Sequence, residues 1–179
     1  MACALPTTPR LAIRAFTLED AAFIVELLND PDWLRHIGDR GVHTLDDARR
    51  YLTDGPLAMQ QREGFALWAV RTHGSAEPLG MCGLLRRPGL ADVDIGYAFL
   101  PAVRGRGYAR EAASAVLGHG FHALGLERIV AITSLDNGAS GRVLGAIGMH
   151  FERRLRVPGH EADSLLYAAE AAFFRRERR

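Results

Sequence analysis

Arg104-Gly105-Arg106-Gly107-Tyr108-Ala109 is the segment around which this 179-residue chain is organised. An apolar run, residues 93–100, precedes it, and residues 109–124 follow with helical periodicity. The order predicted is therefore strand, glycine-rich turn and helix. The first N–H groups of a helix have no intrahelical partner, and glycine lets an anion approach the backbone closely. With two arginines adding charge, the turn is predicted to bind a phosphate or pyrophosphate.

Known phosphate motifs do not identify the compound that this turn binds. The chain has no G-x-x-x-x-G-K-[ST] string, so the turn is not a P-loop. It also departs from the dinucleotide pattern G-x-G-x-x-G, because Arg110 stands where the last glycine is required. Taken alone, the turn could also be a solvated loop that merely needs two glycines.

Composition predicts one soluble globular domain, residues 1–179, with a core of about 11–170. Hydrophobic residues make up 48% of the chain and charged residues 24%. The net charge of +1 argues against a nucleic-acid partner. No signal peptide or membrane-spanning run is seen, so a cytoplasmic monomer or homodimer without a membrane partner is expected.

Cysteines and histidines give no sign of a metal site or of a disulfide framework. Of the two cysteines, Cys3 and Cys82, the second lies in an apolar run and is predicted to be a core residue. His119 and His122 are three residues apart on a predicted helix, and no third ligand is evident. They are expected to be ordinary, partly exposed residues, and no metal is predicted.

Hydrophobic periodicity predicts a strand at 11–16, helices ending near 28 and 52, and then a change to strands. Residues 33–42 are predicted to be an irregular binding loop, and residues 54–56 to interrupt the second helix before a piece that ends near 62. Short turns join strands predicted at 65–71, 79–85 and 92–100, which suggests an antiparallel meander.

The second half of the chain is predicted to continue this pattern with two helices and three strands. One apolar stripe runs along the helix predicted at 108–124, on residues 109, 112, 113, 116, 117, 120, 121 and 124. A strand at 128–133 follows, parallel to the one before the turn if the crossover is a βαβ unit. A helix at 137–147 carries or borders glycines 138, 141, 145 and 148, which suggest close packing or ligand approach. Strands at 149–157 and 164–169 complete a mixed α/β domain.

This order, with the pattern R-x-x-G-x-A at Arg104–Ala109, resembles the GNAT superfamily of acetyl-CoA-dependent N-acetyltransferases, and within it the RimJ/RimL-like branch. The similarity covers about residues 11–167 and rests on Asp94–Tyr97, Arg104–Ala113, Asn137-x-x-Ser140, Ile147–Met149 and the segment 37–42. It implies a mixed, mostly antiparallel central sheet flanked by helices, in which one parallel strand pair splays apart.

The resemblance also implies which residues contact acetyl-CoA. The backbone from Arg104 through Gly105, Arg106, Gly107 and Tyr108 to Ala109 would hold the pyrophosphate. Phe99 and Leu100 would pair with the pantetheine, and Asn137 and Ser140 would line the thioester end. The alternative for Asn137 is a plain helix N-cap, and both roles are compatible.

Asp94 is the first candidate for the catalytic base, because burial among apolar residues would raise the pKa of its carboxyl. The alternative is a structural carboxylate bonded to backbone or to an arginine, and Asp92 is the second candidate. Leu144 stands where many family members have a proton-donating tyrosine, so the resemblance implies Ser140 as the proton donor to the leaving thiolate. Tyr97 and Tyr108 are expected to pack, with their hydroxyls near the site.

The acceptor would be a primary amine, recognised by residues 33–44 and by the final hairpin around 158–160, with Asp39 and Arg40 as candidates. A loop salt bridge is an equal reading of those two residues. An α-amine with a pKa of about 8 is neutralised more easily than a lysine amine with a pKa of about 10.4, which favours a protein N-terminus. A small-molecule amine remains an alternative, as does an acyl-CoA-binding module without turnover.

Overall fold

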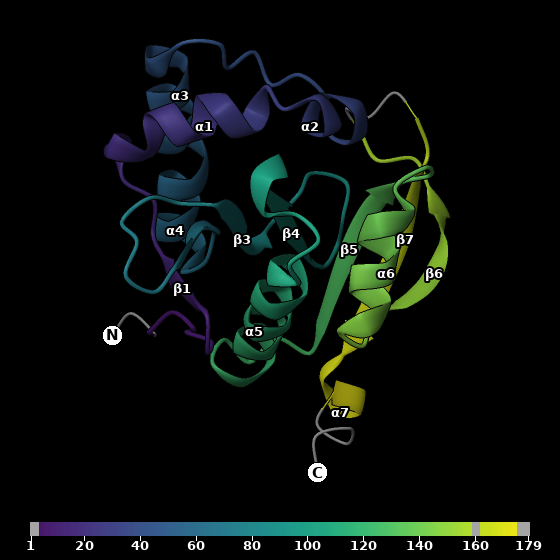
Figure 1. Ribbon diagram of the computed structural model, residues 1–179. Coiled ribbons are helices and arrows are strands. Elements are labelled where there is room, and N and C mark those ends of the chain that lie inside the picture. The colour runs from purple at the N-terminus through teal and green to yellow at the C-terminus, as the bar shows by residue number, and fades with distance from the viewer. Residues whose placement is uncertain (1–3, 159–161, 175–179) are drawn as a thin grey trace.

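Seven strands form one twisted sheet in the order β1-β2-β3-β4-β5-β7-β6. The structure is a computed structural model that describes residues 4–158 and 162–174 (Figure 1). Its strands are β1 Leu11–Arg14, β2 Leu67–Thr72, β3 Gly80–Leu85, β4 Val93–Phe99, β5 Arg128–Ser134, β6 His150–Leu155 and β7 Ser164–Glu170. All neighbours pair antiparallel except β4 and β5, which are parallel. This confirms the predicted sheet.

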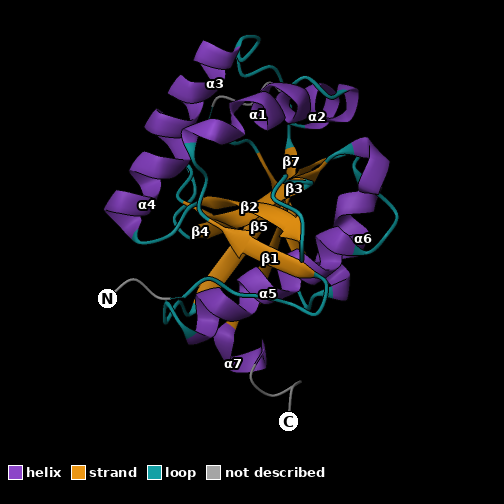
Figure 2. Cartoon of the chain, turned by 60° about the vertical axis from the view of Figure 1, so that its left-hand side comes forward, coloured by secondary structure: helices purple, strands orange, loops and turns teal. Residues whose placement is uncertain are grey.

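Helices cover both faces of the sheet (Figure 2). Helices α1 and α3 pack on one face, whereas α5 packs on the other. The helices are α1 Ala21–Leu28, α2 Pro31–His36, α3 Leu45–Leu52, α4 Ala58–Glu63, α5 Tyr108–His122, α6 Gly138–Ala146 and α7 Ala171–Phe174. A π-helical stretch, Thr53–Leu57, joins α3 to α4. The prediction that residues 54–56 interrupt the helix is therefore wrong. Pro56 lies within this π-helical turn, which is wider than an α-helical turn.

The stripe predicted on α5 is the face that packs on the sheet. Ala112, Ala113, Val116, Leu117 and Phe121 are fully buried. Gly120 is needed for close packing, since a Cβ at this position would lie 2.5 Å from Cδ1 of Ile129. Small residues therefore let α5 sit close to β3, β4 and β5 and fix the position of the glycine turn at its N-terminus.

Strands β4 and β5 separate soon after they begin, as the resemblance implied. They pair only at Val93 with Ile129 and at Asp94 with Val130. Beyond Asp94 the strands splay, so the β5-facing edge of β4 has no strand partner. Because side chains alternate along a strand, Ile95 and Tyr97 point toward α5, and Asp94 points toward the face covered by α1 and α3.

Two predictions about local structure are wrong. Residues 31–36 form helix α2 instead of an irregular loop: Asp30 caps it by accepting from the Trp33 N–H at 3.2 Å, and Pro31 occupies the first turn. The same Asp-Pro pair that ends α1 thus begins another helix. His119 is buried against Trp68, with ring centroids 5.8 Å apart, and is not partly exposed.

Cys82 is fully buried, which confirms it as a core residue. In the described parts of the chain, no helix has the length and apolar character needed to cross a bilayer. The same residues include no group of three or more metal-ligating side chains. Cys3, the tip of the final hairpin at 159–161 and the basic tail at 175–179 lie outside the described residues.

Candidate active site

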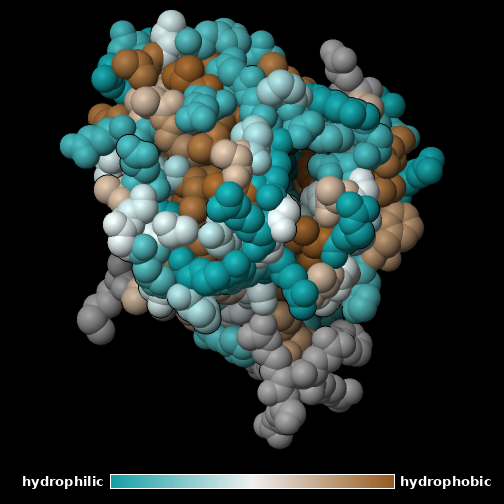
Figure 3. Space-filling view, viewed as in Figure 1, coloured by the Kyte–Doolittle hydropathy of each residue, from teal (hydrophilic) through white to brown (hydrophobic). Residues whose placement is uncertain are grey.

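A cavity of about 850 Å³ lies where β4 and β5 separate. Its walls come from both faces of the sheet: α2 and the loop after it on one side, and Asn137, Ser140 and Leu144 of the α6 region on the other. The strands contribute Asp94–Tyr97 and 131–134. In the space-filling view, a recess with apolar residues in its floor opens between polar surfaces on this face (Figure 3). The cavity is thus lined from both faces of the sheet at the point where the strands splay apart.

Asp94 lies inside this cavity with only 1% of its surface exposed. Its Oδ2 accepts a hydrogen bond from Arg87 Nε at 2.8 Å. Burial raises the pKa of Asp94 to about 6, and the positive charge of Arg87 opposes the rise. A carboxylate with this pKa is deprotonated at neutral pH and is still basic enough to accept a proton during catalysis.

Three buried side-chain atoms in the described residues have no hydrogen-bond partner: Trp33 Nε1, Asp94 Oδ1 and Thr133 Oγ1. All three residues line the same cavity. An unpaired buried polar group costs about 1–3 kcal/mol, so three around one cavity are suited to pairing with a bound molecule. Together they offer a donor, a carboxylate acceptor and a hydroxyl.

Tyr97 and Ser140 meet on the α5–α6 side of the cavity. Their hydroxyl oxygens are 2.8 Å apart, and the Tyr97 hydroxyl also donates to the Ser140 carbonyl oxygen at 3.2 Å. Asn137 caps α6 by accepting from the Ser140 N–H at 3.0 Å, so the N-cap alternative for Asn137 is realised. Tyr97 therefore does more than pack: it orients the hydroxyl of Ser140.

The glycine turn has the backbone conformation that an anion site requires. Gly105 and Gly107 have φ values of +75° and +79°, which other residues adopt only with strain. Among the described residues, we find no hydrogen-bond acceptor for the backbone N–H groups of residues 105–110. These groups precede α5 and form its first turn, so they are available to phosphate oxygens.

The side chain of Arg104, expected to add a phosphate-binding charge, is engaged elsewhere. It donates to the Phe99 carbonyl at 3.0 Å and forms ion pairs with Asp30 and Asp32. These carboxylates flank the start of α2, so Arg104 fastens the turn to that helix. Arg106 is exposed and has no ion-pair partner among the described residues, which leaves its charge available.

The remaining residues predicted to bind the cofactor lie beyond the cavity, at the end of β4 and the start of α5. Phe99 is buried, and its ring fills the space that a side chain on Gly80 would need. Its side chain is thus a core group, and only its backbone could contact pantetheine. Leu100 and Ala109 are partly buried, and Tyr108 has the Arg10 guanidinium 4.7 Å from its ring centroid.

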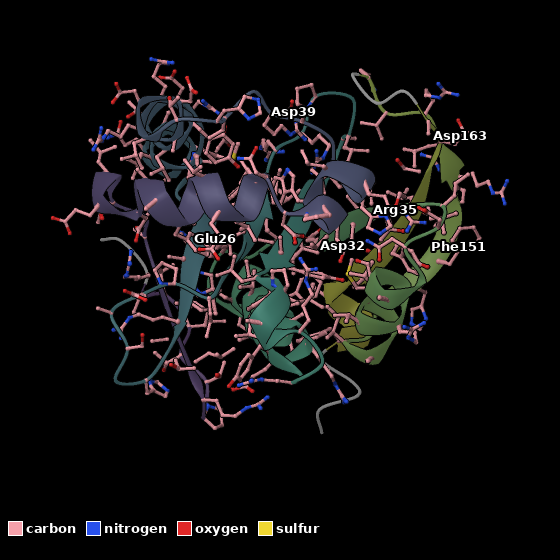
Figure 4. The ribbon with its side chains drawn as sticks, turned by 45° about the horizontal axis from the view of Figure 1, so that its top comes forward. Glu26, Asp32, Arg35, Asp39, Phe151 and Asp163 are labelled. Carbon is pink, nitrogen blue, oxygen red and sulfur yellow. The ribbon has the colours of Figure 1, made fainter. Side chains whose placement is uncertain are left out.

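Asp39 and Arg40 line the cavity from the loop that follows α2. Asp39 is labelled on this loop in Figure 4. Asp39 accepts from the Gly41 N–H at 2.7 Å and lies 3.5 Å from His43 Nε2, so it is partly held within its loop. Asp92, which immediately precedes β4, does not line the cavity and pairs with Arg128 at 3.0 Å. The structure thus favours Asp94 over Asp92 as the carboxylate of the site.

Helix α2 bridges the two sides of the splayed strands. Arg104 holds its start from the glycine turn. Arg35, labelled in Figure 4, holds its end by pairing with Asp136 at 2.7 Å, just before α6. His36 adds a contact from its Nδ1 to Ser134 Oγ at 2.8 Å. The helix therefore forms one wall of the cavity and links it to both elements expected to hold the cofactor.

Sequence reasoning missed Arg87, Thr133 and Ser134 as residues of the site, and it included Trp33 and His36 only as part of the segment 33–44 expected to recognise the acceptor. Arg87 could have been found, because the hairpin places residue 85 opposite residue 94 and so brings Arg87 near Asp94. His36 and Ser134 are 98 residues apart, and no local pattern connects them.

Comparisons with known proteins agree with this architecture. A family model described as "Acetyltransferase (GNAT) domain" matches residues 10–150. The chain is 31% identical over 152 residues to the uncharacterised N-acetyltransferase YoaA of Bacillus subtilis, covering 83% of this chain and 84% of that protein. A GNAT-family acetyltransferase structure from Bacillus anthracis superposes with a TM-score of 0.78 and 29% identity, covering 93% of this chain and 98% of that one.

RimL, a ribosomal L7/L12 α-N-protein acetyltransferase solved in complex with coenzyme A, shares the fold. Its TM-score is 0.70, and the match covers 93% of this chain and 97% of that chain. The sequence identity is 18%, so this likeness concerns the fold alone.

Proposed function

Because this chain belongs to the GNAT acetyltransferase family, we propose that it acetylates the α-amine of a protein or peptide N-terminus. It is an acyltransferase, and acetyl-CoA is the acyl donor of its family. The amine would attack directly while both substrates are bound, without an acyl-enzyme. The observation that carries the proposal is the cavity between β4 and β5, with Asp94 on one face and the Tyr97–Ser140 pair on the other.

The residues present suit coenzyme A. The free N–H groups of residues 105–110 and the charge of Arg106 match a pyrophosphate. The unpaired edge of β4 matches the amide groups of pantetheine, which can bind an extended backbone as another strand does. When bound, acetyl-CoA supplies an activated acetyl thioester.

Asp94 is proposed to accept a proton from the attacking nitrogen as the new C–N bond forms. Arg87 holds Oδ2, which leaves Oδ1 without a partner and directs it to this task. Ser140, oriented by Tyr97, is proposed to donate a proton to the sulfur as the C–S bond breaks. Proton transfers of this kind typically contribute 10²–10⁴-fold to a rate.

An α-amine suits a base of this strength. At neutral pH an α-amine with a pKa of about 8 is neutralised at a cost of about 1 kcal/mol, whereas a lysine amine costs about 4–5 kcal/mol. The free donor at Trp33 Nε1, on the Asp94 side of the sheet, matches the first carbonyl oxygen of a peptide. Asp39 and Arg40, on the loop after α2, are proposed to contact the residues that follow.

The test is acetyl transfer from acetyl-CoA to paired peptides, followed by mass spectrometry. One peptide has a free N-terminus and a blocked lysine, and its partner has a blocked N-terminus and a free lysine. We expect a gain of one acetyl group on the first peptide alone. Transfer only to the second peptide, or only to small amines such as polyamines, would refute the proposed acceptor while retaining the activity.

A further inference from the structure

His36, the last residue of α2, is held by groups from the other side of the cavity. Its Nδ1 lies 2.8 Å from Ser134 Oγ and 3.3 Å from Asp136 Oδ1. The Ser134 hydroxyl in turn donates to Asp136 Oδ1 at 3.0 Å. The imidazole side chain is 17% exposed and lines the cavity.

This network determines which nitrogen of His36 carries the proton. Ser134 has a single hydroxyl hydrogen, and that hydrogen is directed to Asp136. Pairing with Arg35 helps to lower the pKa of Asp136, so this carboxylate is ionised and only accepts. Both neighbours of Nδ1 are therefore acceptors, and Nδ1 carries the hydrogen. The lone pair of the neutral ring is on Nε2, for which we find no partner among the described residues.

The ring is on the acceptor side of the sheet. Asp94 is paired with Val130, and Ser134 lies four residues further along β5, so alternation places Ser134 on the same face as Asp94. A histidine whose far nitrogen is fixed by a serine and a carboxylate, and whose near nitrogen is free at a cavity, has the arrangement of a general base.

We propose that His36 Nε2 removes the first proton from the incoming ammonium group of the acceptor. This inference rests on the proposed function, which leaves two protons to be removed from the ammonium nitrogen. His36 takes one and produces the neutral amine, and Asp94 takes the other as the C–N bond forms. The sulfur receives one proton from Ser140, Asp94 and His36 each release one proton to solvent, and Ser140 regains one from solvent. One proton is thus released per turnover.

A purely structural role for His36 makes a different prediction. The ring could serve only to hold α2 against β5, in which case the contact from Nδ1 would be sufficient. Replacing His36 by asparagine retains a side-chain N–H near the position of Nδ1 and removes Nε2. Replacing it by alanine removes both, and leaves space in which free imidazole can bind.

The experiment compares His36→Asn, His36→Ala and the control His73→Asn in acetyl transfer to the free-N-terminus peptide. His73 is exposed, bonds one backbone carbonyl through Nε2 and does not line the cavity. We expect His36→Asn to lower kcat about 10²-fold, with acetyl-CoA affinity and melting temperature close to those of the wild type. Added imidazole should restore kcat of His36→Ala at least tenfold in a saturable manner, and His73→Asn should retain wild-type activity.

Retention of wild-type kcat by His36→Asn, or failure of imidazole to restore His36→Ala when that variant is folded, would overturn the inference. Calorimetric titration with acetyl-CoA and thermal unfolding identify any variant that has lost its fold. If the wild-type enzyme acetylates another amine but not the peptide, the proposed acceptor fails, and the same variants are compared on that amine. If wild type acetylates no amine, the proposed function and this inference fail together.

Discussion

Arg87 and Asp94 form an ion pair in which the carboxylate is buried and the guanidinium reaches solvent. Arg87 Nε lies 2.8 Å from Asp94 Oδ2, with side-chain exposures of 20% and 1%. The arginine keeps the carboxylate ionised at neutral pH against the cost of burial, and it occupies only one oxygen. The ion pair therefore leaves Oδ1 of Asp94 as a buried, basic atom in the cavity, without a hydrogen-bond partner among the described residues.

Asp94→Asn is expected to lower kcat by about 10²–10⁴-fold, because the amide has nearly the same shape and cannot accept the proton. Acetyl-CoA affinity should change less than about twofold, since the cofactor is expected on the opposite face. Steady-state kinetics and calorimetric titration measure the two effects. The matched control is Asp92→Asn, which loses an ion pair outside the cavity and should retain activity.

The pH profile gives a second readout of the same residue. With the pKa of Asp94 raised to about 6, the carboxylate is protonated and inactive below that pH and becomes active above it. We therefore expect kcat/KM of the wild type to rise with pH through about 6, in addition to any rise caused by the acceptor amine. An unchanged acid limb in Asp94→Asn, or near-normal turnover, would show that Asp94 is a structural carboxylate.

Much of the fold could be predicted because its signals are local. Periodicity and turn residues placed each strand within about two residues of its ends, and the alanine-rich stripe identified the buried face of α5. Helix α2 was missed because residues 33–42 were interpreted as an irregular loop, although Asp30 at the N-cap and Pro31 at N1 are typical of a helix start.

The site was harder to predict because it depends on contacts between distant parts of the chain. Asp94, Asn137 and Ser140 were found from motifs, and the structure brings them to one cavity. The ion pair between Arg104 and Asp30 joins residues 74 positions apart, and no local sequence pattern predicts it. The contact between His36 and Ser134 was missed for the same reason.

Ser140→Ala and Tyr97→Phe are expected to lower kcat through one shared pathway. Their hydroxyl oxygens are 2.8 Å apart, so loss of either hydroxyl disrupts the hydrogen bond that is proposed to support proton donation to the sulfur. We expect about a tenfold loss for Tyr97→Phe and a larger loss for Ser140→Ala, with the double variant close to Ser140→Ala alone. Additive losses in a double-mutant cycle would contradict a shared role.

Arg106→Ala and Arg104→Ala should separate phosphate binding from structural support. Arg106 is exposed and free, so its removal should weaken acetyl-CoA binding several-fold at low salt, and the effect should shrink as ionic strength rises. Loss of Arg104 leaves the buried Asp30 carboxylate without its ion-pair partner, which should lower the free energy of unfolding by about 1–2 kcal/mol. Titrations at two salt concentrations and thermal unfolding distinguish these effects, and equal behaviour of the two variants would contradict the assignment.

Gly141 and Gly145 of α6 are predicted to respond oppositely to alanine. A Cβ at Gly141 would lie 2.7 Å from the Tyr167 hydroxyl, whereas one at Gly145 meets nothing within 4 Å. Alanine is favoured over glycine in a helix, so Gly145→Ala should stabilise the protein by about 0.5 kcal/mol, less than a mid-helix site would give because it is near the helix end. Gly141→Ala should be less stable than Gly145→Ala by at least about 1 kcal/mol, since Tyr167 must shift. Equal unfolding free energies in denaturant titrations would show that close packing does not explain Gly141.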